Sequence, residues 1–241
     1  MAYRCRECGY RSPKWLGRCP RCGSWDSFEE IPEQGKDEGT GWIGARPQAL
    51  PEVKKLPTQR LPTGISEVDR LLGGGLIPGS VILFGGEPGI GKSTLLLQLV
   101  AALAGAGHKV LYVSGEEAPA QVKLRAERLG IEAPNLYLLS EQHLLRIVKA
   151  IEELEPRVLV VDSLQTVVAR PEGGDIGGVA QVREAAAQLA RLAKGLSMTC
   201  FLVSHITKGG EFAGPKTVEH LVMWPCTLRE QGKGISGSCG P

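Results

Sequence analysis

The sequence predicts an α/β fold, in which a parallel sheet is covered by helices on both faces and is preceded by a small cysteine-rich module. Three observations predict it. Apolar segments alternate with helical segments through most of the chain, a glycine-rich loop joins one apolar segment to a helix, and four cysteines lie near the start. Parallel sheets of this kind bind ligands at the carboxyl ends of their strands.

The predicted elements follow one another in a regular order. Ser66 and Asp69 resemble a capping box, with aspartate in place of the usual glutamate or glutamine, and would open a short helix that Gly73–Gly75 ends. Short apolar runs predict strands, and helical spacing of apolar residues predicts helices. Strands are expected at residues 80–85, 109–114, 135–139, 157–162 and 199–205, and helices at 95–104, 119–129, 142–154 and 179–195.

Composition places the chain among globular proteins. Its 241 residues, 42% of them hydrophobic, suffice for one α/β domain and a small appendage, and the formal net charge of +2 says little about partners. No run approaches the roughly 18–20 apolar residues of a membrane span, and the first residues lack the apolar core of a signal peptide. We therefore expect a cytoplasmic protein with no membrane partner.

The cysteines near the start predict a metal site. Cys5 and Cys8 form one C-x-x-C-G motif, and Cys19 and Cys22 form a second one ten residues later. Two such turns typically hold one tetrahedral Zn²⁺ through four thiolates, which would stabilise a fold with almost no core. A rubredoxin-like iron site or a redox dithiol is the alternative. Cys200 lies in an apolar run and is expected in the core.

Domain boundaries follow from these patterns. We expect a zinc finger at 1–29, a linker rich in proline, glycine and charge at 30–60, the α/β core at 61–222 and a separate tail at 223–241. Basic residues and tryptophans alternate in the finger, which suits either nucleic-acid binding or a solvated surface. Trp25 is expected to pack on the metal site.

The glycine-rich loop fits the phosphate-binding pattern G-x-x-x-x-G-K-[S/T] with no mismatch. A strand before it and a helix after it argue against a chance glycine-rich turn. Lys92 would reach the β- and γ-phosphates and is a candidate catalytic residue, and the hydroxyl of Ser93 would bind Mg²⁺. The expected nucleotide-binding residues are Gly86, Glu87, Pro88, Gly89, Ile90, Gly91, Lys92, Ser93 and Thr94.

Acidic residues end two further strands. Asp162 closes an apolar strand in a Walker B pattern and would hold Mg²⁺ together with Ser93. Glu116 and Glu117 follow the strand at 109–114. Hydrolysis of a nucleoside triphosphate needs a carboxylate that orients the attacking water, and we assign this role to Glu116, with Glu117 as the alternative.

Polar residues also end the strand at 199–205. Ser204 and His205 are candidate sensors of the γ-phosphate, although each could form an ordinary structural hydrogen bond. Two glycine-rich loops, at 170–178 and 208–216, are long enough to be functional, or they are plain surface. In a ring or filament they could face DNA, and the candidate contacts are Arg183, Lys208 and Lys216.

Several motifs carry a resemblance to known proteins. These are the paired C-x-x-C motifs and the segments 71–80, 112–117, 161–166 and 213–216. The core resembles the RecA-type ATPases, and within them the chain, over residues 1 to about 222, resembles the bacterial RadA (Sms) family. The resemblance implies a RecA-like core and a DNA-stimulated ATPase that uses ATP, Mg²⁺ and Zn²⁺. It further implies branch migration of intermediates in DNA repair and homologous recombination.

The same resemblance implies partners. It suggests a hexameric ring that acts on single-stranded and branched DNA, and a recombinase filament is a candidate partner. A replicative-type helicase or a clock-type ATPase is an alternative within the same group, but the cysteine module argues against both. A nucleotide- and DNA-binding module without productive turnover, because of a C-terminal truncation, is an alternative of another class.

The tail departs from that family. The family continues with a strand that begins V-D-x-x-L-Y, a K-N-R-F-G motif and a Lon-protease-like domain. When the residues from Met223 on are read one nucleotide earlier, they can encode D-V-A-L-Y, and Ile235–Cys239 can encode D-F-R-V-L. We therefore hypothesise a single-base frameshift at about Met223, and we expect residues 223–241 to be unstructured.

Overall fold

The computed structural model consists of two compact units, Met1–Arg46 and Pro47–Pro241, which are described separately. Three of the candidate site residues, Cys8, Lys208 and Lys216, lie outside the described residues, as does the side chain of His205. The structure describes residues 2–7, 11–12, 14–20, 22–31, 49–52, 59–170, 177–205, 224–231 and 234–239.

The N-terminal unit contains a three-stranded antiparallel sheet in the order β2-β1-β3. Its strands are β1 (Ala2–Cys5), β2 (Arg11–Ser12) and β3 (Phe28–Ile31), so that β3 ends two residues beyond the expected end of the module. Cys5, Cys19 and Phe28 form its small core. So few apolar side chains cannot stabilise a fold alone, which is consistent with a metal-dependent module.

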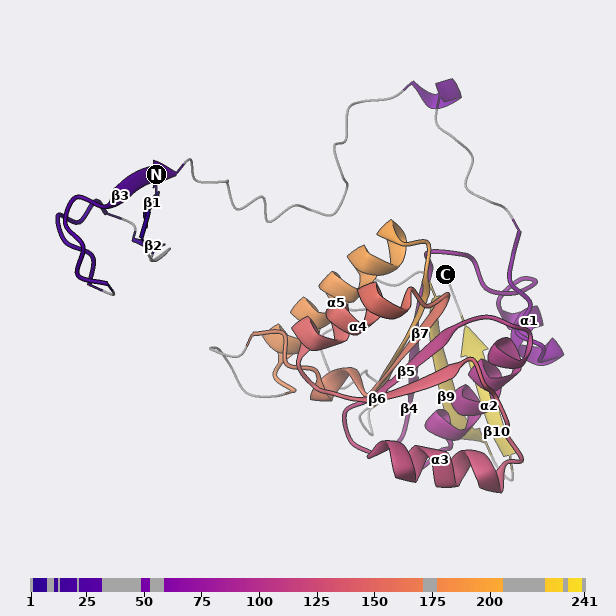
Figure 1. Ribbon diagram of the computed structural model, residues 1–241. Coiled ribbons are helices and arrows are strands. Elements are labelled where there is room, and N and C mark those ends of the chain that lie inside the picture. Colours follow the sequence, from indigo (N-terminus) through magenta and orange to yellow (C-terminus); the bar gives the residue numbers. More distant parts are fainter. Residues whose placement is uncertain are drawn as a thin grey trace. The chain divides into compact units, whose positions relative to one another are not determined.

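The second unit contains a seven-stranded sheet in the order β10-β9-β4-β8-β7-β5-β6 (Figure 1). The strands from β4 to β8 are parallel and match the five expected ones: β4 (Val81–Gly86), β5 (Val110–Ser114), β6 (Leu136–Ser140), β7 (Val158–Asp162) and β8 (Thr199–His205). The helices are α1 (Ser66–Leu71), α2 (Lys92–Gly105), α3 (Pro119–Arg128), α4 (Leu144–Leu154) and α5 (Val179–Gly195), with short 3-10 helices at Leu50–Glu52 and Leu164–Thr166.

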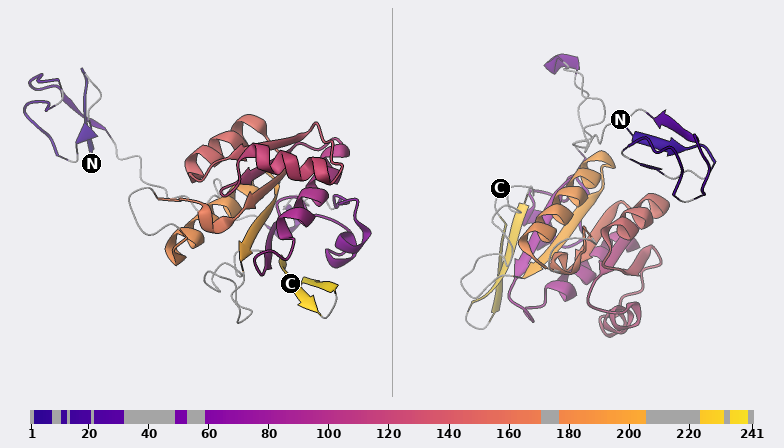
Figure 2. Two further views of the ribbon diagram at one scale, coloured as in Figure 1. Left: turned by 90° about the horizontal axis from the view of Figure 1, so that it is seen from below. Right: turned by 90° about the vertical axis from the view of Figure 1, so that its left-hand side faces the viewer.

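Helices cover both faces of this sheet, which confirms the predicted fold class. Figures 1 and 2 show α4 and α5 on one face and α2 and α3 on the other. Alternate residues of β4 contribute to two separate cores, because Val81 and Leu83 pack beneath α4 and α5 while Ile82 packs beneath α2. Cys200 is fully buried, as expected, and burial raises the pKa of its thiol. No helix in the described part of the chain is both long and apolar enough to cross a membrane.

The expected capping box is wrong. Helix α1 begins at Ser66, but the hydroxyl of Ser66 donates to Glu67, and Ile65 occupies the N-cap position without a side-chain bond. The carboxylate of Asp69 instead accepts the backbone N–H of Thr63 at 2.8 Å. The acidic residue therefore stabilises the segment that enters the domain, rather than the first turn of the helix.

The expectation of an unstructured tail is also wrong where the structure describes it. Strands β9 (Trp224–Gln231) and β10 (Gly234–Cys239) form an antiparallel hairpin, and β9 runs parallel to β4. Without β9, β4 would present unpaired backbone groups along one edge of the sheet, and such an edge readily accepts another strand. The buried side chain of Cys226 joins the core beneath α2.

Candidate nucleotide-binding site and metal centre

The parallel strands bring the candidate residues to one edge of the sheet. Gly86 at the end of β4 pairs with His205 on β8, and Ser114 at the end of β5 pairs with Asp162 on β7. Each of these strands therefore ends at the same level. The phosphate-binding loop, Glu116 and Asp162 follow these ends, so that they meet where α/β sheets bind their ligands.

Two glycines give the phosphate-binding loop its shape. Gly89 and Gly91 have φ values of 83° and 96°, which residues with a Cβ atom rarely adopt. Gly91 is the N-cap of α2, where Leu95 donates its N–H to the Gly91 carbonyl at 2.9 Å. The loop is exposed from Glu87 to Gly89. Backbone N–H groups and the positive end of a helix dipole thus border an accessible anion site.

Lys92 is buried at the base of this loop. Its Nζ donates to the carbonyl oxygens of Gly86 at 2.8 Å and Glu87 at 2.9 Å. Burial lowers the pKa of Lys92, and the negative charges of Asp162 and Glu116 oppose this shift. The electrostatic interaction with both acids places the lysine among the groups expected to act together.

Asp162 ends β7 and accepts a hydrogen bond from a residue that the sequence analysis did not single out. Tyr112 on β5 is fully buried and donates its hydroxyl to Asp162 Oδ2 at 2.6 Å. Burial, with the neighbouring charge of Asp162, raises the pKa of Tyr112 well above its usual range. The phenol therefore remains a donor to the carboxylate. The sequence around a tyrosine in a buried strand does not reveal that its hydroxyl bonds to an aspartate 50 residues away.

The two glutamates after β5 have different environments. Glu116 is exposed, and its Oε1 accepts the hydroxyl of Ser163 at 2.7 Å. Glu117 forms a two-oxygen ion pair with Arg125 on α3, with N–O distances of 2.8 Å. An ion-paired carboxylate is less available to a water molecule, so the geometry favours Glu116 as the water-orienting residue.

Among the candidate sensor and DNA-contact residues, the structure describes the side chains of Ser204 and Arg183. Ser204 is buried, and its hydroxyl accepts the side-chain N–H of Gln165 at 2.7 Å, which connects the end of β8 to the segment after β7. Arg183 is exposed on α5. Gln165 was not predicted as part of the site, because its role depends on a contact between segments that are distant in sequence.

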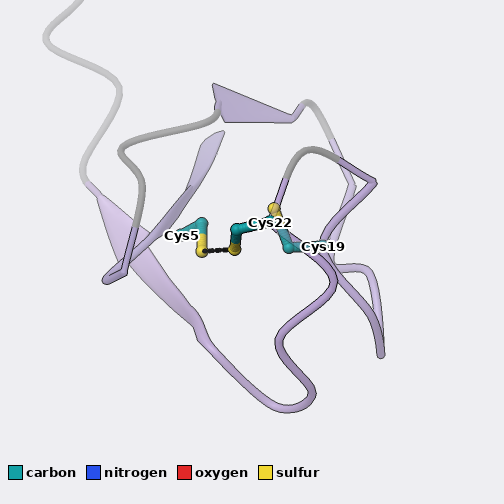
Figure 3. A group of neighbouring side chains, drawn as sticks. All are labelled: Cys5, Cys19 and Cys22. Carbon is teal, nitrogen blue, oxygen red and sulfur yellow. Dashed lines mark hydrogen bonds between the residues drawn. The ribbon is translucent and has the colours of Figure 1, made fainter.

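Three of the four predicted metal ligands lie together in the N-terminal unit. Figure 3 shows the thiols of Cys5 and Cys22 facing each other, with Cys19 beside them. Their sulfur atoms all lie within 4.8 Å of one another, and Cys5 and Cys22 are 3.6 Å apart. Two sulfurs bound at about 2.3 Å to one tetrahedral zinc ion would lie about 3.8 Å apart. The described thiols thus fit a shared metal ion.

Trp25 does not cover this centre, contrary to expectation. Its side chain is 73% exposed, and the guanidinium of Arg18 lies 5.7 Å from the centre of its ring. Phe28 packs against the cysteines instead. Trp15 is 51% exposed, so the module presents aromatic surface beside positive charge.

Models of known protein families match both the cysteine module and the domain with the parallel strands. A family model described as an AAA domain matches residues 46–211, and the chain belongs to this family. A second model, described as a rubredoxin metal binding domain, matches residues 3–30.

Curated proteins similar to this chain confirm the resemblance to the RadA family that the motifs indicated. Each is named DNA repair protein RadA. The protein of Halalkalibacterium halodurans is 45% identical over 226 residues, which cover 91% of this chain and 50% of that protein. Those of Streptococcus pyogenes serotype M1 and Bacillus subtilis are 48% and 44% identical over 222 and 225 residues, covering 90% of this chain and 49% of each relative. The chain spans about half the length of these relatives.

Proposed function

We propose that the chain is an ATPase that uses the energy of ATP hydrolysis to act on DNA during repair and recombination. One observation carries the proposal: Lys92 begins α2, Asp162 ends β7 and Glu116 follows β5, so that all three lie at the carboxyl edge of one sheet. The names of the relatives, which are DNA repair proteins, support DNA as the object of this activity and a cytoplasmic location.

The geometry supports a direct mechanism. Backbone N–H groups of the loop at 86–94, which Pro88 lacks, and the α2 N-terminus would bind the phosphates, with Lys92 on the β- and γ-phosphates. Ser93 and Asp162 offer oxygen ligands of the kind Mg²⁺ prefers, and the ion would neutralise phosphate charge. Glu116 would orient and polarise the attacking water. Ser204 and His205 remain candidate sensors of the γ-phosphate at the end of β8.

We assign zinc to the cysteine centre. The 3.6 Å separation of the Cys5 and Cys22 sulfurs suits a tetrahedral thiolate site, with Cys8 as the expected fourth ligand. Iron would bind similar ligands, and visible absorbance together with elemental analysis would distinguish an iron site from a zinc site.

DNA would be bound by positive and aromatic surface. Arg183 is exposed on α5, and Lys208 and Lys216 are further candidates from the sequence. Trp25 and Arg18 offer a stacking surface on the metal-binding module. A hexameric ring that promotes branch migration remains the proposal for the assembled protein, supported by the family resemblance.

The ATPase assay tests this function. We expect hydrolysis that single-stranded DNA stimulates, no hydrolysis by Lys92→Ala, and a loss of roughly 10²–10⁴-fold in kcat for Glu116→Gln with ATP binding retained. Glu117→Gln is the matched control and should retain most of the rate, because Glu117 is paired with Arg125.

The same assays distinguish an ATPase from a module that binds nucleotide and DNA without turnover. Full hydrolysis by Lys92→Ala would overturn the site assignment. Nucleotide and DNA binding by the unaltered chain without turnover would instead support the binding module.

A further inference from the structure

Two hydrogen bonds cross between β5 and β7, and each joins an acidic residue of the site to a hydroxyl from the other strand. Tyr112, on β5, donates to Asp162 at the end of β7. Ser163, directly after β7, donates to Glu116 beyond the end of β5. Both donors are buried, at 0% and 1% exposure, whereas Glu116 itself is exposed.

We infer that Tyr112 and Ser163 are positioning residues, and that each holds one acid of the site in place. The inference rests on the proposed ATPase function. Tyr112 would fix the carboxylate that is expected to hold Mg²⁺, and Ser163 would fix the carboxylate that is expected to orient water.

The backbone around the two acids supports this positioning role. The N–H of Gly115 donates to the carbonyl of Asp162 at 2.9 Å, which continues the ladder of β5 and β7 beyond their last paired residues. The hydroxyl of Thr166 donates to the carbonyl of Ser163 at 2.8 Å and holds the turn after β7. The two donors therefore rest on ordered backbone, as positioning groups must.

Two substitutions remove one hydroxyl each, and the neighbouring strand β6 supplies matched controls. The test variants are Tyr112→Phe and Ser163→Ala. Tyr137→Phe removes a hydroxyl from a half-exposed tyrosine on β6, and Ser140→Ala removes one from an exposed serine at the end of that strand.

Binding ratios on the full chain give a measurement that does not depend on turnover. For Tyr112→Phe, the affinity for ATPγS is measured with and without Mg²⁺. For Ser163→Ala, the affinity for ADP in Mg²⁺ is measured with and without aluminium fluoride, which imitates the transition state. Each ratio compares the affinity of one variant under two conditions, so a general loss of stability cancels.

We expect each test variant to change only its own ratio. Tyr112→Phe should reduce the gain in ATPγS affinity from Mg²⁺ by about tenfold, and Ser163→Ala should reduce the gain from aluminium fluoride by about tenfold, since a hydrogen bond to a charged group is lost. In an Asp162→Asn background, Tyr112→Phe should add nothing to the magnesium effect, because it acts through that carboxylate.

Ratios equal to those of Tyr137→Phe and Ser140→Ala would overturn the inference, and so would additive effects of Tyr112→Phe and Asp162→Asn. The outcome is distinct from that of the proposed function. If the unaltered chain binds these ligands but does not hydrolyse ATP, the ATPase proposal fails, whereas the two ratios still decide the roles of Tyr112 and Ser163.

Discussion

Replacing Gly115 with alanine should damage the site through lack of space. A Cβ atom at Gly115 would lie 2.6 Å from the Cβ of Thr166 and closer still to its hydroxyl oxygen. Neither side can readily move. The Thr166 hydroxyl is bonded to the Ser163 carbonyl at 2.8 Å, and the Gly115 carbonyl accepts the side-chain N–H of Gln142 at 2.6 Å.

The magnitude follows from these constraints. Overpacking a core costs about 1–3 kcal/mol, and the bonds on both sides place Gly115→Ala in the upper part of that range, at about 2–3 kcal/mol. For a chain of this size the melting temperature should fall by roughly 4–12 °C. Glu116 is the next residue, so we also expect kcat to fall by about tenfold or more, because misplaced catalytic groups lose rate steeply.

Thermal unfolding and steady-state ATPase assays check this prediction. Gly105→Ala is the control, since nothing lies within 4 Å of its added Cβ and alanine suits a helix. A second change, Thr166→Gly, should restore part of the stability of Gly115→Ala, whereas Thr166→Ala leaves the Cβ contact and should restore less. Gly115→Ala with the melting temperature and kcat of Gly105→Ala would refute the reasoning.

Three further predictions follow. The N–H of His143, with other donors, lowers the pKa of Glu141 to about 2, so its stabilisation is present above pH 4.5 and is lost as the pH falls toward 2. Glu141→Gln should melt below the unaltered protein at pH 7, with a gap that closes in acid; a constant gap would contradict this. Cys19→Ser should lose its zinc by elemental analysis; a full equivalent retained would exclude the site. Trp25→Ala should weaken single-stranded DNA binding about tenfold by fluorescence anisotropy; unchanged affinity would show that no base stacks there.

The sequence predicts the order and type of the main elements because their signals are local. Continuous apolar runs such as residues 158–161 can be buried on both faces only between two helix layers, and α5 begins and ends at the residues expected. The phosphate-binding loop and the cysteine motifs carry their chemistry within a few residues, so that their spacing alone indicates a site.

The features that sequence analysis missed depend on contacts between distant segments. Nothing in the sequence reveals which side chains Tyr112 and Ser163 bond to, because these partners lie 50 and 47 residues away. Trp25 was expected on the metal centre because aromatic residues usually stabilise small cores, but Phe28 occupies that place. The strands β9 and β10 were missed because an unpaired sheet edge accepts many sequences.

The bonds of Lys92 also bear on how readily the loop could bind an anion. Two of the three ammonium protons bond to carbonyl oxygens at the base of the loop, so these bonds fix the position of the charged group. Ordering a long side chain costs conformational entropy, and here that cost falls on folding. An anion that bound to the loop would therefore meet a positive charge already in place, and less of its binding energy would go into ordering the lysine.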